Sequence, residues 1–175
     1  MISALIWPWS LGQWVKHNQS IKQTSKKNMI KNTTISDTCN SLLQGELSAI
    51  ETYTQAIKKF GTSEGDGPLE GIRADHVANA ESLRMLVGEC GKEPATDSGA
   101  WGTFATSVEG VATLLGKSPA LLVLQQGEEH GVRQYEEALE DEQLSEAVKN
   151  LIRNTLLPAQ REHLAALERC KMNAA

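Results

Sequence analysis

Four ionisable residues fall on the apolar stripes of helices that the hydrophobic spacing predicts, one on each helix: Glu46, His76, Glu128 and His163. A buried carboxylate without a partner costs several kcal/mol or takes up a proton. Two carboxylates and two imidazoles can meet this cost by binding a cation, and their oxygen and nitrogen atoms suit iron, manganese or zinc. The pattern therefore predicts a metal site inside a helical bundle. Two alternatives stay open, namely a metal-free hydrogen-bond network between the same residues and four side chains that never meet.

The helices that carry these residues resemble one another in pairs, which indicates an internal repeat. Within each pair of helices, matching positions are separated by a constant number of residues. In one pair, Gly45, Glu46, Ile50, Tyr53 and Ala56 match Gly127, Glu128, Val132, Tyr135 and Ala138. In the other pair, Asp75, His76, Ala78 and Glu81 match Glu162, His163, Ala165 and Glu168. Tyr53 and Tyr135 are predicted to be core aromatic residues. The alternative is that they donate hydrogen bonds to the site or are redox-active.

The elements that must position the site are all predicted helices. Capping residues, glycines and prolines place them at about 37–60, 68–91, 119–140 and 144–171, with a shorter helix over 99–115 and a kink at Pro158. Long helices joined by short turns, with one long connection in the middle, predict two hairpins. We therefore expect an all-α four-helix bundle with a long crossover that contains the short helix.

The distance of each site residue from its turn predicts a mismatch in height. Glu46 stands further from the turn of the first hairpin than His76 does, and His163 stands further from the second turn than Glu128 does. At ~1.5 Å per residue the offset in the first hairpin is ~9 Å. Unless the loop and Pro158 absorb this offset, the glutamates and histidines are expected to form separate layers.

At these residues the chain resembles the ferritin-like superfamily, which includes rubrerythrin and bacterioferritin, over residues 37–171. It is most similar to a bacterial branch described as a domain of unknown function. The resemblance implies a four-helix bundle with an interior di-iron or di-manganese site. Its pattern is a lone Glu from each of two helices and Glu-x-x-His from each of the other two. Glu46 and Glu128 match the lone glutamates, and His76 and His163 match the histidines.

Two positions differ from the superfamily pattern, because Arg73 and Gln160 stand where Glu-x-x-His has its glutamates. An Arg brings positive charge to a place that needs negative charge, so one metal is predicted in preference to two. The neighbouring carboxylates, Asp75 and Glu162, point about 100° away from their histidines. The resemblance implies a redox or stress-related role, and the alternative is a metal-free bundle that acts as a structural or interaction module.

The length of 175 residues suits a single bundle, predicted over 36–172, behind a basic leader over 1–35. The leader has five lysines, three tryptophans and no acidic residue, and we expect it to be disordered or artefactual, with Met29 as an alternative start. A weak anchor at a membrane surface is the competing interpretation. The remaining residues hold all 22 acidic side chains. This acidity argues against binding to nucleic acid.

Three separated cysteines without a C-x-x-C motif, Cys39, Cys90 and Cys170, predict no disulfide and a reducing, cytoplasmic location. No apolar run reaches the ~20 residues of a transmembrane helix. Leu122 and Val123 lie partly outside the main stripe of their helix and could support a homodimer. No nucleophile, phosphate-loop or dinucleotide motif appears, and the sequence names neither a substrate nor a redox partner.

Overall fold

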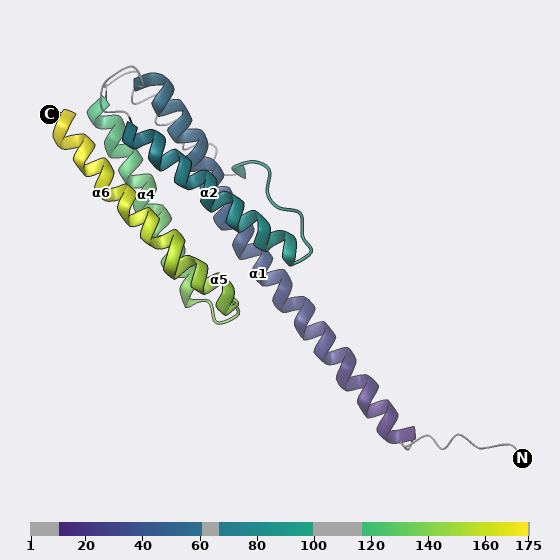
Figure 1. The fold of residues 1–175 in the computed structure, drawn as a ribbon. Coiled ribbons are helices and arrows are strands. Elements are labelled where there is room, and N and C mark those ends of the chain that lie inside the picture. The colour runs from purple at the N-terminus through teal and green to yellow at the C-terminus, as the bar shows by residue number, and fades with distance from the viewer. Residues whose placement is uncertain (1–10, 61–66, 100–116, 175) are drawn as a thin grey trace, which may run out of the picture.

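Two helical hairpins lie side by side in the computed structural model, which describes residues 11–60, 67–99 and 117–174 (Figure 1). The first hairpin consists of α1 (Leu11–Phe60) and α2 (Gly67–Glu89). The second consists of α4 (Lys117–Glu140) and a long helix made of α5 (Glu146–Leu151), the π-helical turn η2 (Ile152–Leu156) and α6 (Leu157–Ala174). The predicted all-α bundle of four long helices is confirmed.

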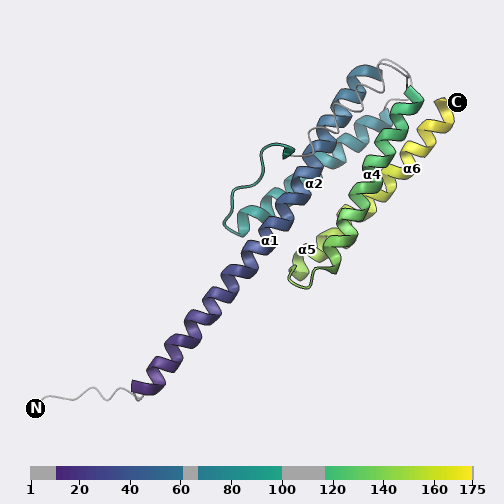
Figure 2. The ribbon, with the colours of Figure 1, turned by 180° about the vertical axis from the view of Figure 1, so that it is seen from behind.

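Helix α1 extends far beyond the bundle, as the ribbon seen from both sides shows (Figure 1, Figure 2). Its predicted start at residue 37 was wrong, because the helix begins at Leu11. Ser36 does not cap a helix here but donates from its hydroxyl to the carbonyl of Thr33 at 2.8 Å. Such bonds to the preceding turn keep Ser and Thr compatible with a helix interior. Over residues 11–35 the backbone is helical.

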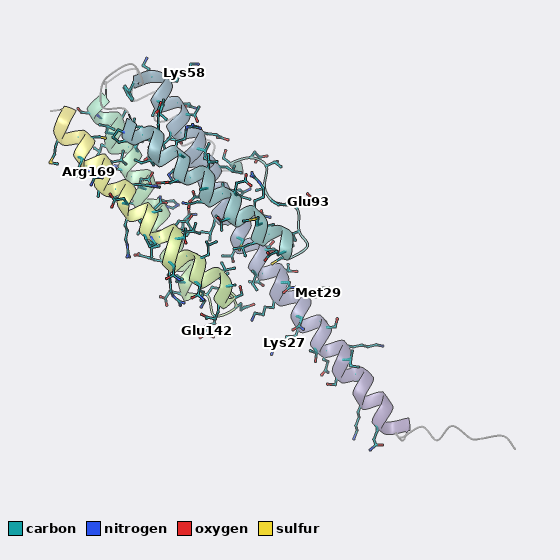
Figure 3. The ribbon with its side chains drawn as sticks, in the orientation of Figure 1. Lys27, Met29, Lys58, Glu93, Glu142 and Arg169 are labelled. Carbon is teal, nitrogen blue, oxygen red and sulfur yellow. The ribbon has the colours of Figure 1, made fainter. Side chains whose placement is uncertain are left out.

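Burial divides α1 into two parts. Among the residues of α1 whose burial the structure describes, the side chains from Gln19 to Met29 are exposed, and Ile35 and Ser36 are the first buried ones. Figure 3 places Lys27 and Met29 on the part of α1 that leaves the bundle. The division of the chain into a leader and a bundle stays a prediction.

The segment after α2 is tied to α1 by polar contacts. Gly91 ends the helix with φ of +75°, a conformation that glycine adopts without strain. Lys92 then pairs with Asp37 at 2.5 Å, and Asn40 donates to the carbonyl of Glu93 and accepts from the amide of Ala95. These contacts lead the chain back along α1. The short helix predicted at 99–115 lies almost entirely outside the described residues.

The fourth helix changes its hydrogen-bond pattern just before Pro158. Leu157 donates its amide to the carbonyl of Ile152, five residues earlier, within the π-helical turn. A proline has no amide to donate and crowds the preceding turn, which favours an irregularity at this point. A kink was predicted at Pro158, and the structure has a π-helical turn over Ile152–Leu156, directly before this region.

Two apolar clusters fill the bundle on either side of a polar layer. One cluster packs α1 and α2 against the turn of the second hairpin, and the other lies toward the opposite end. The fully buried leucines and isoleucine of the first are Leu43, Leu83, Ile152 and Leu156, and the largest fully buried members of the second are Tyr53, Leu69, Leu121, Leu124 and Leu167. The predicted metal residues lie along the chain between these two sets. Apolar packing therefore holds the four helices in place on both sides of the polar layer.

Three further features concern the predicted homodimer, the cysteines and the search for a membrane-spanning helix. Leu122 is 48% exposed, while Val123 packs against the core, so the homodimer stays a prediction. Cys39, Cys90 and Cys170 are free thiols. No helix within the described ranges is both long and apolar enough to cross a membrane.

Candidate metal centre

The structure brings all four predicted site residues into contact in one buried layer. His76 lies between the two glutamates, with its Nδ1 2.8 Å from Glu46 Oε2 and its Nε2 3.2 Å from Glu128 Oε1. His163 Nδ1 lies 3.2 Å from Glu128 Oε2. None of the four residues is more than 4% exposed. The predicted offset in height is therefore absorbed, and the glutamates and histidines do not form separate layers.

The four site residues lie in one layer because the two helices of a hairpin do not run level with each other along regular α-helical geometry. Figure 1 shows that α1 continues past the point at which α2 begins, so the two helices are staggered along their axes. In the second hairpin the π-helical turn inserts a residue relative to α-helical spacing and shifts the faces of α6 relative to α5. The predicted offset was counted in residues from each turn. That count assumed that paired helices meet the turn at the same level and are α-helical throughout, and neither assumption holds.

Two tyrosines complete the carboxylate contacts, and each reaches across to the other hairpin. Tyr53 on α1 donates to Glu128 Oε1 at 2.5 Å, and Tyr135 on α4 donates to Glu46 Oε1. Both rings are buried, as predicted, but the expectation that they are only core aromatics was wrong. Each tyrosine stands seven residues after the glutamate of its own helix, on the same face, and this spacing was the available signal.

Gln160 is a further member of the layer that the sequence interpretation treated only as a missing glutamate. Its Nε2 donates to Glu128 Oε2 at 2.5 Å, and the residue is 3% exposed. Gly131 makes room for this amide, since a Cβ at position 131 would overlap with it. At the equivalent position of the first hairpin, Arg73 is half-buried.

Asp75 also contacts the site, although its side chain was predicted to point away from it. It belongs to α2, and its Oδ2 lies 3.3 Å from Nε2 of His163 on α6. The prediction considered only His76, the neighbour of Asp75 in sequence, and missed the histidine on the adjacent helix. Glu162, the matching residue of the second hairpin, pairs instead with Arg169 at the surface.

Electrostatic coupling inside the layer is strong. Burial by itself would lower the pKa of His76, but the carboxylates of Glu46 and Glu128 outweigh it and raise this pKa to about 10. Burial would raise the pKa of Glu128, but the two histidines lower it to about 2. Burial and the adjacent carboxylates raise the pKa of both tyrosines well above its usual value. Without a metal, His76 is therefore a cation between two carboxylates at neutral pH.

The donor atoms also fit one metal ion. His76, Glu128 and His163 each offer a ligand atom, and these three atoms lie within 4.8 Å of one another. Each histidine has its inner nitrogen 3.2 Å from one of the two oxygens of Glu128, so Glu128 lies between the two imidazoles that could share an ion with it. The outer nitrogens of the two histidines face Glu46 and Asp75, an arrangement that orients metal-bound imidazoles in proteins. Glu46 lies outside the three-residue group.

The fold and this layer define an all-α helical bundle with a buried Glu/His cluster that could hold a metal ion. The family described as "Domain of unknown function (DUF2383)" matches residues 34–141, more than half of the chain, and the protein belongs to this family. The match includes Glu46, His76 and Glu128 and ends before His163. No curated protein and no solved structure matches the chain.

Proposed function

We propose that this protein is a ferritin-like metal-binding bundle that holds one iron, manganese or zinc ion through His76, Glu128 and His163. The observation that carries the proposal is the convergence of these three side chains, from three different helices, within one buried layer. Glu46 was predicted as a fourth ligand, and its contact with the outer nitrogen of His76 supports a role in orienting that ring. The proposed redox or stress-related role rests on the superfamily resemblance.

The surrounding residues would prepare the ligands for a metal. Tyr53 and Gln160 hold the two oxygens of Glu128, and Asp75 accepts from the outer nitrogen of His163. Bound iron or manganese would supply one-electron chemistry, whereas zinc would supply a Lewis acid. The chain itself contributes a buried layer and fixed ring orientations. These are the conditions under which ligand geometry is set before the metal arrives.

A metal-free structural or interaction module is the second candidate function, and one observation favours it. All four carboxylate oxygens of Glu46 and Glu128 already contact a tyrosine, a histidine or the Gln160 amide. The cationic His76 balances part of the negative charge. Such a network satisfies the buried carboxylate oxygens without any ion.

Metal content separates the two candidates. The protein is purified without chelator, analysed by elemental mass spectrometry, and titrated without oxygen with Fe(II), Mn(II) and Zn(II). We expect about one ion per chain, and loss of that ion in His76→Ala and in Glu128→Ala. His130→Ala is the matched control, because His130 lies on α4 but outside the three-residue group. Circular dichroism shows whether each variant keeps its helices.

The possible outcomes distinguish three situations. One ion that is lost with the site variants and retained with His130→Ala supports the proposal. Two ions per chain indicate a dinuclear site despite Arg73 and Gln160. A folded wild-type protein that takes no metal under any condition rejects metal binding, and the structural or interaction module then stands.

A further inference from the structure

The first half of α1 forms a basic arm, residues 11–35, that leaves the bundle (Figure 1, Figure 2). The arm holds five of the 17 Lys and Arg residues of the chain and none of its 22 acidic residues. All five lysines are exposed: Lys16, Lys22, Lys26, Lys27 and Lys31. At ~1.5 Å per residue the arm is about 37 Å long, so it carries this positive charge away from the acidic bundle.

The sequence of the basic arm does not favour an isolated helix. Eight of its residues are Ser, Thr or Asn, which have low helix propensity. Two pairs of lysines stand four residues apart, where like charges repel along a helix. These pairs are Lys22 with Lys26 and Lys27 with Lys31. Because tertiary packing supplies most of the stability of helices in proteins, an exposed helix of this composition calls for a negatively charged partner.

An acidic turn, Glu140–Glu142, lies at the end of the bundle from which the basic arm leaves (Figure 3). Glu140 and Glu142 are exposed, and neither forms an ion pair within the described part of the chain. In contrast, Glu146, which follows the turn on α5, pairs with Arg153. The acidic turn is therefore a patch of negative charge that the chain's own basic residues do not neutralise.

A second copy of the chain fits the basic arm better than a membrane or a nucleic acid does. An interfacial helix needs an apolar face, but only Ile21 and Met29 are apolar among the eleven exposed side chains from Gln19 to Met29. The acidic bundle would repel a nucleic acid. The arm points away from the acidic turn of its own chain (Figure 1, Figure 2). Since every copy carries one arm and one turn, two copies can match their charges reciprocally.

We propose that two copies of this chain form a symmetric dimer in which the basic arm of each copy lies along the bundle of the other, with Lys27 and Lys31 against the second copy's acidic turn. The arm and the turn lie at the same end of the bundle, so one antiparallel placement makes both contacts. Each contact occurs twice in such a two-fold arrangement. This association goes beyond the proposed metal function and does not require a bound ion.

The oligomeric state of the full chain in chelator tests the proposal. Sedimentation equilibrium is measured at ~0.01 M and ~1 M salt, where the Debye length is ~30 Å and ~3 Å. We expect a dimer at low salt and a dissociation constant at least about tenfold higher at high salt. A wild-type monomer at low salt, or a dimer that is insensitive to salt, would overturn the proposal. Metal content is measured separately, so a failure of the dimer is distinct from a failure of the metal proposal.

Charge reversals identify the two contacting surfaces. One variant carries Lys27→Glu and Lys31→Glu on the basic arm. The other carries Glu140→Lys and Glu142→Lys on the acidic turn. Each variant should raise the dissociation constant at low salt at least about tenfold, because arm and turn then have the same charge. An equimolar mixture of the two variants should restore a dimer, since the arm of each is then opposite in charge to the turn of the other.

The matched control reverses two exposed lysines at the other end of α1 with Lys58→Glu and Lys59→Glu, and it should leave dimerisation unchanged. An equal loss in this control, or a mixture that stays monomeric, would contradict the assigned surfaces. Binding of a monomeric wild-type protein to phosphatidylserine vesicles would assign the basic arm to membranes and would also overturn the proposal. The wild-type salt comparison decides the question even if a variant fails to fold.

Discussion

The two hairpins contribute matching residues to the polar layer but unequal numbers of contacts. Glu128 of the second hairpin contacts both histidines, Tyr53 and Gln160. Glu46 of the first hairpin contacts His76 and Tyr135. A repeat in sequence has therefore produced an asymmetric site, in which one carboxylate is central and the other is peripheral. This asymmetry favours a single ion beside Glu128 over a symmetric pair.

The carboxylates that contact the outer nitrogens of the two histidines are also unequal in burial and in distance. His76 contacts the buried Glu46 at 2.8 Å, whereas His163 contacts Asp75, whose side chain is 61% exposed, at 3.3 Å. Water screens an exposed carboxylate, so its influence on an imidazole is smaller. The comparison predicts that equivalent substitutions in the two hairpins have unequal effects.

Removing the charge of the central carboxylate should have the largest effect. We expect Glu128→Gln to lower metal affinity at least about 100-fold, since it loses a ligand, and Glu46→Gln to lower it about tenfold. In chelator, Glu128→Gln should reduce the free energy of unfolding by ~3–5 kcal/mol, because His76 loses a buried ionic partner. Metal titration and urea unfolding measure these effects. Equal losses in the two variants would contradict the asymmetry.

The pH dependence of the stability of the metal-free protein should separate the contribution of the Glu128 carboxylate from that of the His76 cation. The pKa of Glu128 falls from 4.5 to about 2 on folding, so its contribution is present above pH 4.5 and is lost as the pH falls toward 2. The pKa of His76 rises from 6.5 to about 10, so its contribution is present below pH 6.5 and is lost as the pH rises toward 10. Stability should therefore be greatest at about pH 4.5–6.5.

Urea unfolding in chelator across the pH range checks this profile. In Glu128→Gln the loss of stability at acid pH should become smaller. The loss of stability at alkaline pH should also become smaller, because His76 keeps only one of its two carboxylate partners and its pKa is raised less. Unchanged stability from pH 6.5 to 10 in the wild-type protein would rule out the proposed charge state of His76. The same proton must leave before a metal can bind His76, so metal affinity should rise with pH over this range.

The two tyrosines offer a matched pair of smaller changes. Tyr53→Phe and Tyr135→Phe each remove one hydrogen bond to a buried carboxylate, and each should cost ~1.5–3 kcal/mol of stability. Metal affinity should respond unequally, with a loss of about tenfold in Tyr53→Phe and a smaller one in Tyr135→Phe, since only Tyr53 contacts a proposed ligand. Parallel denaturation and metal titrations measure both quantities. A larger loss of metal affinity in Tyr135→Phe would place the ion beside Glu46 instead.

Asp75→Asn should give the smallest effect. Because Asp75 is exposed and its contact with His163 is long, we expect a stability change below ~1 kcal/mol and a few-fold loss of metal affinity. Glu46→Gln, which changes the buried partner of the other histidine, is the comparison. An effect of Asp75→Asn as large as that of Glu46→Gln would show that burial does not determine the strength of the outer contact.

Much of the site could be predicted from the sequence, because the relevant information is local. The apolar spacing within each helix places Glu46, His76, Glu128 and His163 on inward faces without reference to any other helix. The repeat relates the two hairpins, and the glycines and prolines give most of the helix ends. The start of α1 was missed because a serine can either cap a helix or stand inside one. Only the hydrogen bond from Ser36 to the carbonyl of Thr33 shows that this serine stands inside the helix.

Sequence alone thus determined the all-α class, the inward direction of four ionisable side chains and their pairing by type. Only the tertiary structure decided which carboxylate is central, that Tyr53 and Tyr135 cross between hairpins, and that Asp75 reaches the histidine of another helix. The physical reason is that helical periodicity depends on residues three or four positions apart. The stagger and rotation of neighbouring helices depend instead on packing between residues that are distant in the chain.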